Sequence, residues 1–247
     1  MLPVTAIMVT RGLRPALAKM AIQSFLDQSY PDKLLLIVNT GRSIYGRDSA
    51  PESVKELLIP DLDSAPLGYV RNWSVQWATE LSPVRWIMQW DDDDWSHPDR
   101  MSYQATAVEA SSDKLRAVVL RSQVRIDLPQ QQAMVINWPA VEPAGIPGTV
   151  LLPPRQLKNY YYDPTLRKHE DTYLLARFFA GKDTLVLQNL DVPHYYLRLF
   201  HGGNTWHHKH FFQGHPTVSF DSLQPKATSD YVKHWYASCG HALTNQE

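Results

Sequence analysis

The sequence has a single cysteine, Cys239, among its 247 residues. One thiol excludes an intrachain disulfide framework and a zinc site built from several thiolates, and it fits a reducing compartment. The sequence also lacks a charge excess, because 24 lysines and arginines stand against 25 aspartates and glutamates. No overall charge draws the chain to nucleic acid or to an anionic membrane, so a polyanionic partner has to be bound by a local patch.

No long hydrophobic run is present. The densest apolar stretch, residues 34–38, is far shorter than the ~20 residues that a membrane-spanning helix needs. The first four residues carry no basic segment before an apolar one, so the sequence does not predict a secretory signal. From these features we expect no transmembrane segment and a cytoplasmic location.

Strand and helix patterns alternate through the first half of the chain. Residues 33–39 contain a continuous apolar run, which is typical of a strand buried on both faces of a parallel sheet. The patterns predict three strands and three helices, over 4–10, 33–39 and 84–90 and over 14–28, 69–81 and 98–110. Their order opens with a βαβ unit and predicts an α/β fold with a parallel sheet.

The second half of the chain has weaker patterns. They predict a strand, a short amphipathic helix, a further strand and a last helix, over 115–126, 170–180, 183–192 and 230–237. Residues 128–154 are rich in glutamine and proline, which indicates irregular structure. From Pro216 the composition turns polar, so this end is expected to be a helical cap or a tail.

Four consecutive aspartates, Asp91 to Asp94, stand between two tryptophans and directly follow the strand expected over 84–90. Like charges side by side are unfavourable unless something positive neutralises them. Open α/β sheets bind ligands at the carboxyl ends of such strands. Oxygen ligands favour Mg²⁺, Mn²⁺ or Ca²⁺ over zinc, and Mg²⁺ takes one or two carboxylates with the rest from water and phosphates. The run predicts a site for a metal and a phosphate-bearing substrate, with a solvated acidic turn as the alternative.

An ordered set of five segments resembles family 2 glycosyltransferases of the GT-A fold. The segments are residues 4–11, 21–28, 67–72, 91–94 and 98–101. The likeness covers residues 4–180, with a weaker echo to residue 215, and the order of the segments is more specific than any single motif. The resemblance implies a Rossmann-like, mixed but mostly parallel central sheet flanked by helices. It also implies a nucleotide-sugar-binding half, an acceptor-binding half of the same domain and a C-terminal helical cap or tail, over 1–115, 116–215 and 216–247.

The resemblance assigns roles within the acidic run. In this family a strand-end Asp-x-Asp motif holds Mn²⁺ or Mg²⁺ between the two phosphates of a nucleotide-sugar, and the matching residues are Asp91 and Asp93. Asp93 is expected to be the metal ligand. Asp91 is expected to face the ribose or a metal-bound water, with Asp92 beside the donor and Asp94 in support. Such a metal stabilises the charge on the departing diphosphate by several kcal/mol.

Other donor contacts follow from the same resemblance. Arg71 matches the family's basic residue near the donor, with a surface arginine as the alternative. Thr10 and Arg11 follow the first strand and are expected beside the donor, although the family's common Asn-Arg pair is replaced here by Arg11-Gly12. After the second strand, residues 39–42 replace the family's Asp-Asp-Gly-Ser. Asn39 can still bond a uracil or a ribose, but the nucleotide base is not assigned.

An inverting sugar transfer needs one further group, a base that takes the proton of the acceptor hydroxyl as its oxygen attacks the anomeric carbon. The segment from His169 to Asp171 resembles the family's Glu-Asp motif at the start of a helix, where the position of Asp171 acts as the base. Glu170 is expected to orient the acceptor or to cap the helix. Acidic residues that open helices are also ordinary capping residues, which is the alternative for both.

Histidines are concentrated late in the chain, where residues 194–215 hold six of the ten. An imidazole can complete the metal site or contact the diphosphate. His201 is the best placed, because related enzymes bring a late histidine or arginine over the donor. Glycine at 202 and 203 lets such a loop close tightly. The alternatives are exposed loop histidines, or zinc bound incidentally by His207 and His210.

Together these features predict a metal-dependent, inverting glycosyltransferase that moves a sugar from a nucleoside-diphosphate sugar to an acceptor hydroxyl. The acceptor is open: a glycan, a lipid-linked sugar, a protein, a small molecule or a modified nucleic-acid base. A DNA acceptor predicts a basic face made by Arg116, Arg121, Arg125, Arg155, Lys158, Arg167 and Lys168. A metal-dependent phosphoryl hydrolase and a non-catalytic nucleotide- or carbohydrate-binding module are the alternatives. The sequence predicts no oligomeric state.

Overall fold

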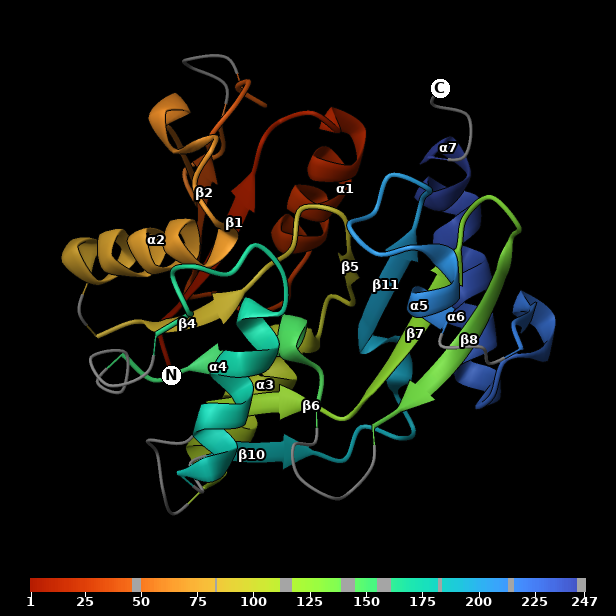
Figure 1. Ribbon diagram of the computed structural model, residues 1–247. Coiled ribbons are helices and arrows are strands. Elements are labelled where there is room, and N and C mark those ends of the chain that lie inside the picture. Colours follow the sequence, from red (N-terminus) through yellow and green to blue (C-terminus); the bar gives the residue numbers. More distant parts are fainter. Residues whose placement is uncertain are drawn as a thin grey trace.

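A computed structural model describes residues 1–45, 50–82, 84–111, 117–138, 145–154, 161–181, 184–212 and 216–243. Within these ranges the larger sheet has seven strands, in the order β10-β6-β9-β4-β1-β2-β3 (Figure 1). They are β1 (Val4–Thr10), β2 (Lys33–Asn39), β3 (Val54–Leu58), β4 (Trp86–Gln89), β6 (Ala117–Leu120), β9 (Leu151–Leu152) and β10 (Thr184–Leu187). Strand β9 is antiparallel to both of its neighbours, and the other pairs are parallel. The predicted mixed, mostly parallel sheet is confirmed.

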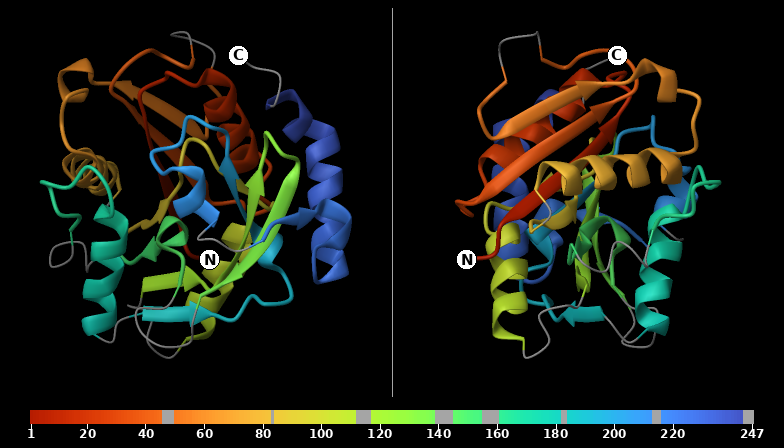
Figure 2. Two further views of the ribbon diagram at one scale, coloured as in Figure 1. Left: turned by 45° about the vertical axis from the view of Figure 1, so that its right-hand side comes forward. Right: turned by 90° about the vertical axis from the view of Figure 1, so that its left-hand side faces the viewer.

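Helices cover both faces of this sheet. They are α1 (Pro15–Leu26), α2 (Leu67–Leu81), α3 (Arg100–Ala110) and α4 (Glu170–Ala180). Successive side chains of a strand point to opposite faces, so Ala6 and Met8 of β1 share a core with α1 and α3, whereas Ile7 shares one with α2 and α4. Figure 2 shows α3 and α4 on opposite sides of the strands. No helix in the described ranges is long and apolar enough to cross a membrane.

A second sheet, which the sequence did not predict, has five strands among the described residues, in the order β12-β8-β7-β11-β5. They are β5 (Trp95–Ser96), β7 (Ser122–Asp127), β8 (Gln132–Asn137), β11 (Tyr196–Phe200) and β12 (Val218–Ser219). Most of this sheet lies to the right of the larger one in Figure 1. Its strand β5 directly follows the acidic run, and β11 directly precedes His201, so this sheet carries two parts of the candidate site.

Two expectations for the second half of the chain are corrected. The single strand expected over 115–126 is wrong, because β6 and β7 belong to different sheets and meet at Arg121. Asn189 explains the break: its Oδ1 accepts hydrogen bonds of 2.9 Å from the backbone N–H groups of both Arg121 and Ser122. The irregular structure expected over 128–154 is wrong in part, because β8 and β9 lie there.

Arg100, at the start of α3, joins the two sheets. Its side chain is almost fully buried, and its guanidinium lies 5.1 Å from the centre of the Trp90 ring and 5.0 Å from that of Tyr196. It also donates hydrogen bonds to the backbone carbonyls of Gln89 and Gly148. Cation–π contacts and hydrogen bonds of this kind replace the hydration that a buried arginine loses. They hold the end of β4 against β11.

The C-terminal segment folds as a helical cap. Its main helix, α6 (Lys226–Trp235), corresponds to the helix expected over 230–237. His194, in the 3₁₀ turn before β11, lies against α6: its ring centre is 4.9 Å from that of Tyr231, and its Nδ1 is 3.0 Å from Oγ1 of Thr228. The ring of His97 packs against the rings of both His194 and Tyr231, and its centre lies 5.3 Å from that of His194. The buried His194 and the partly exposed His97 therefore attach the cap to the body of the protein.

Because of these histidines, the free energy of unfolding should decrease at acidic pH. Burial, and then the nearby His97, lower the pKa of His194 to about 4. Because an unfolded histidine has a pKa of about 6.5, the unfolded chain binds the proton more tightly. Stability is then full at neutral pH and is lost as the pH falls toward 4. We expect a loss of about 2 kcal/mol between pH 7 and pH 5, measured by urea unfolding.

The variant His194→Gln tests the source of this acid sensitivity. A glutamine side chain does not titrate, so the stability of the variant should change less between pH 7 and pH 5 than that of the wild type. Equal changes in the two proteins would assign the effect to other groups.

Candidate active site

A pocket of about 650 Å³ opens at the carboxyl ends of β1 and β4. β1 ends at Thr10 and β4 at Gln89, and because the two strands are parallel their ends lie at the same edge of the sheet. The acidic run after β4 therefore faces the loop after β1. Segments far apart in the sequence supply the charged lining, which includes Arg14, Arg71, Arg167, Lys168, Asp171 and Arg198.

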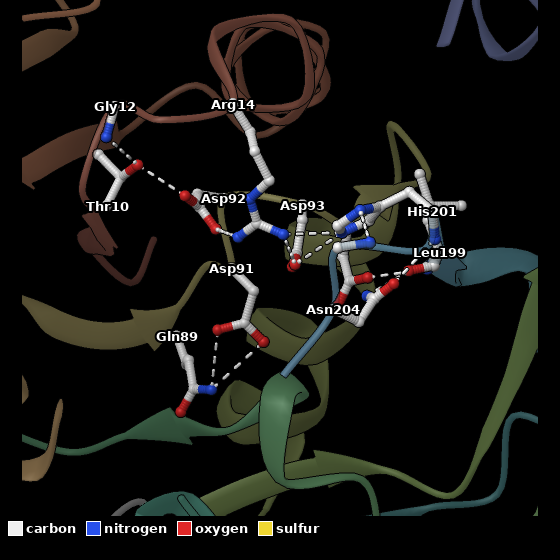
Figure 3. Close-up of polar contacts among 12 residues, drawn as sticks. Thr10, Gly12, Arg14, Gln89, Asp91, Asp92, Asp93, Leu199, His201 and Asn204 are labelled. Carbon is white, nitrogen blue, oxygen red and sulfur yellow. Dashed lines mark hydrogen bonds and ion pairs between the residues drawn. The ribbon is translucent and has the colours of Figure 1, made fainter. Parts of the chain in front are cut away.

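The two middle carboxylates face the loop after β1 (Figure 3). Asp92 accepts a hydrogen bond of 2.6 Å from the hydroxyl of Thr10 and one of 3.3 Å from Arg14. Asp93 accepts one of 2.9 Å from the same guanidinium. The same oxygen, Oδ2 of Asp93, also lies 3.3 Å from Nε2 of His201. The structure thus brings together the two predicted metal ligands, which are 108 residues apart in the sequence.

The two outer carboxylates are held by other elements. Asp91 forms an ion pair of 2.9 Å with Arg71 of α2. Asp94 is buried, where it accepts hydrogen bonds from the Tyr196 hydroxyl and, at 2.9 Å, from the backbone N–H of Leu199. Both of these donors belong to β11. Asp94 therefore fastens the strand that precedes His201 to the acidic run, which makes it a positioning residue.

Burial and close spacing give three of these carboxylates different pKa values. Burial and the neighbouring Asp93 raise the pKa of Asp94 to about 8 and that of Asp92 to about 6. Burial also acts to raise the pKa of Asp93, but the hydrogen bond with His201 and the charge of Arg14 outweigh it, so this pKa is lowered. Asp93 is thus ionised more readily than its neighbours. An ionised carboxylate is what a hard metal ion requires.

The donor atoms of Asp93 and His201 fit a divalent cation. Adjacent ligands of an octahedral cation with bonds of about 2.1 Å lie about 3.0 Å apart, and Oδ2 of Asp93 and Nε2 of His201 are 3.3 Å apart. Asn204 supports this arrangement, because its Oδ1 accepts a hydrogen bond of 2.8 Å from the backbone N–H of His201. No group of three or more metal-ligating side chains was found among the described residues. A cation here would therefore take its other ligands from water or phosphate.

Arg198 of β11 is a pocket residue to which sequence reasoning gave no role. Within the described ranges its guanidinium makes no hydrogen bond or ion pair with the protein; it lies over the ring of Phe211, at 5.1 Å. Burial acts to lower its pKa, but Asp94, Tyr196, Asp171 and Asp91 together outweigh burial and raise it. The N–H groups are therefore free for an anion. A signal was present: arginine interrupts the apolar pattern of β11, between Leu197 and Leu199.

The two predicted acceptor-side acids have different surroundings. Glu170 is 3% exposed and forms an ion pair of 3.0 Å with Arg71, which joins it to Asp91. Asp171 lies half-buried on the pocket wall, where its Oδ1 accepts a hydrogen bond of 2.7 Å from the backbone N–H of Thr172. In the part of the chain that the structure describes, its Oδ2 accepts none. Asp171 is thus the less constrained carboxylate of the pair.

The expected donor residues do not all reach the pocket. Thr10 and Arg11 line it, and Arg11 forms an ion pair of 3.0 Å with Asp63. Asn39 does not line it. Its side chain is fully buried, donates a hydrogen bond of 2.7 Å to Glu56 and accepts one of 2.9 Å from the N–H of Gly41.

The basic residues expected to form one face are dispersed. Arg125 is buried and donates to the backbone carbonyl of Phe211, and Arg121 is bonded to the carbonyl of Trp138. Arg167 and Lys168 line the pocket. The remaining members, Arg116, Arg155 and Lys158, lie outside the described residues.

The late histidines are dispersed as well. His208 is bonded to Asp127, with 2.6 Å between Nε2 and Oδ2. His210 stacks on Trp206 with 4.2 Å between ring centres. His215 lies outside the described residues. Of the late histidines that the structure describes, His201 is the member that reaches the acidic run.

No family model matches the chain, and no curated protein matches it in sequence. Solved structures of S. aureus TarS, a glycosyltransferase, are similar in fold. Residues 1–349 of TarS give a TM-score of 0.57 at 12% identity, covering 95% of this chain and 72% of that one. The complex with UDP-GlcNAc gives 0.59 at 12% identity, covering 99% and 76%. The chain has a glycosyltransferase fold. It spans 44% of the longer TarS structure.

Arg71 should be essential for the stability of this glycosyltransferase fold. The variant Arg71→Met leaves Asp91 and Glu170 without their shared cation, so we expect the free energy of unfolding to fall by about 3–5 kcal/mol in urea denaturation. The control Arg42→Met changes an exposed arginine and should stay within about 0.5 kcal/mol of the wild type. Adding Glu170→Gln to Arg71→Met should restore part of the loss. A small effect of Arg71→Met would show that water solvates both carboxylates.

Proposed function

We propose that the protein is a metal-dependent, inverting glycosyltransferase that transfers a sugar from a nucleoside-diphosphate sugar to an acceptor hydroxyl. The observation that carries this proposal is the contact between Asp93 and His201 at the edge of a pocket that Asp93, Asp171 and Arg198 line. The glycosyltransferase fold supports it. TarS structures contain UDP and UDP-GlcNAc, so a uridine diphosphate sugar is the donor class that we propose here.

The metal and diphosphate are expected on one side of the pocket. Asp93 and His201 would hold Mn²⁺ or Mg²⁺, which when bound stabilises the negative charge of the leaving diphosphate. Arg198 supplies free N–H donors for the phosphate oxygens from the neighbouring strand. Hydrogen bonds between a guanidinium and phosphate are charge-assisted and directional. Asp91 is fixed by Arg71 and can bond the ribose or a water at the site.

Asp171 is expected to act as the base. Its free Oδ2 can take the proton of the acceptor hydroxyl as the hydroxyl oxygen forms a bond to the anomeric carbon and the diphosphate leaves. A single displacement of this kind inverts the configuration and needs one carboxylate, whereas retention by double displacement needs a nucleophile as well. Glu170 is engaged by Arg71 and is poorly placed to be that nucleophile. This division of the two acids supports inversion.

A thermal-shift panel of nucleoside diphosphates tests the donor and the metal. We expect UDP with Mn²⁺ to raise the melting temperature by several degrees more than UDP or Mn²⁺ alone, because ligand at 100 times its Kd adds about 2.7 kcal/mol of stability. Asp93→Ala should abolish the Mn²⁺-dependent part, whereas Asp61→Ala, which changes an exposed aspartate, should keep it. An equal shift without metal would refute metal dependence. If no nucleoside diphosphate stabilises the protein, the donor proposal fails.

Release of UDP from UDP-GlcNAc in the presence of Mn²⁺ tests the base, with water as the acceptor. Asp171→Asn should bind UDP as the wild type does, but it should hydrolyse UDP-GlcNAc to UDP at least ~100-fold more slowly. Asp163→Asn is the matched control, because it removes an exposed carboxylate that precedes the same helix. Unchanged turnover in Asp171→Asn would refute the base assignment. Binding without turnover in the wild type would indicate a binding module, and release of inorganic phosphate would indicate a phosphoryl hydrolase.

A further inference from the structure

Arg14 holds a position that the proposed reaction does not explain. Its Nη1 lies 2.9 Å from Oδ2 of Asp93 and 2.7 Å from Nε2 of His201, and its Nη2 lies 3.3 Å from Oδ1 of Asp92. Figure 3 shows the guanidinium entering the acidic run from the loop before α1, with His201 facing it. The same nitrogen of Arg14 thus contacts both atoms that would coordinate a metal.

The backbone that carries Arg14 is tightly placed. Gly12, two residues earlier, has a φ of +63°, and a Cβ on it would lie 2.0 Å from the carbonyl oxygen of Arg42. Its N–H donates a hydrogen bond of 3.0 Å to Oγ1 of Thr10, and Pro15 begins α1 directly after Arg14. The Cα of Arg14 is therefore held beside the acidic run. Its side chain is 35% exposed, so the guanidinium can leave toward the solvent.

A metal and the Arg14 guanidinium compete for Oδ2 of Asp93 and for the space beside Nε2 of His201. A cation bound to Oδ2 of Asp93 and Nε2 of His201 would sit about 2.1 Å from each. Arg14 Nη1 already lies against both atoms, at hydrogen-bond distance. Two positive groups also repel each other in a pocket where water screens them poorly. Occupation by one therefore excludes the other.

We propose that Arg14 is an internal counter-ion of the metal site, which must leave Asp93 and His201 before a divalent cation can bind. This inference rests on the proposed metal-dependent function. It predicts that metal alone binds weakly, because binding has to break the contacts of Arg14. A nucleoside diphosphate offers the displaced guanidinium new anionic partners in the same pocket. Metal and nucleotide should therefore bind cooperatively, and Arg14 is the residue through which they are coupled.

The experiment measures Mn²⁺ affinity by the paramagnetic resonance of free Mn²⁺, with and without UDP. For Arg14→Ala without UDP we expect the Kd for Mn²⁺ to fall about tenfold, and the further gain on adding UDP to shrink. Arg167→Ala is the matched control: it removes an arginine of the same pocket that is bonded to the carbonyl of Ser64, and it should change the Mn²⁺ affinity by less than about twofold. Equal effects of the two variants would reduce the role of Arg14 to general repulsion and overturn the proposal.

A second variant, which keeps the positive charge, provides a test if Arg14→Ala does not fold. Arg14→Lys keeps the charge, but a lysine lacks the guanidinium fork that contacts both Asp92 and Asp93. It should bind Mn²⁺ several-fold more tightly than the wild type. Unchanged or weaker binding in both Arg14 variants would overturn the proposal. The absence of Mn²⁺ binding in every variant would overturn the metal site itself, whereas equal Mn²⁺ binding in the wild type and in Arg14→Ala would overturn the role of Arg14 alone.

Discussion

Four adjacent carboxylates at the end of one strand repel one another, and the site is arranged around their separate neutralisation. The carboxylates take their partners from several parts of the chain: Asp91 from α2, Asp92 from the end of β1, Asp93 from the loop after β11 and Asp94 from β11, while Arg14 is shared by Asp92 and Asp93. The acidic run is therefore connected to both sheets. Because these partners are charged or hydrogen-bonding groups, the same contacts that relieve repulsion also bring the functional side chains into one pocket.

The different pKa values of these carboxylates follow from this arrangement. A buried carboxylate with a high pKa, such as Asp94, serves best as a hydrogen-bonding anchor, and it fastens β11 in place. Asp93 faces Arg14 and His201, which favour its charged form. Arg71 engages Glu170, whereas Oδ2 of Asp171 accepts no hydrogen bond from the residues that the structure describes. Neighbouring acids of similar type thus acquire different protonation and hydrogen bonding from their surroundings.

The predictions succeeded where the pattern was local. The strands at 4–10 and 33–39 and the helix at 170–180 were predicted close to their observed bounds, because each buries a regular set of apolar side chains. The second sheet was missed for two reasons. Strands β5 and β12 are only two residues long. The apolar pattern runs on from β6 into β7, and the chain leaves the first sheet there because of hydrogen bonds to Asn189, which is 67 residues from Ser122 in the sequence. Asn39 stands where the family has a different motif, and its buried side chain is bonded to Glu56 and Gly41.

By itself, the sequence determined the strands β1, β2 and β4 of the larger sheet, the location of the acidic run at a strand end and the choice of Asp93, His201 and Asp171 as candidates. Their residue types and order along the chain carry this information. Only the tertiary structure decided that Asp93 and His201 meet, that Arg71 engages Glu170, and that Arg14 and Arg198 face the same pocket. These contacts join residues that are up to 187 positions apart, as Arg14 and His201 are. Local periodicity in the sequence does not predict such contacts, because they depend on how the two sheets pack.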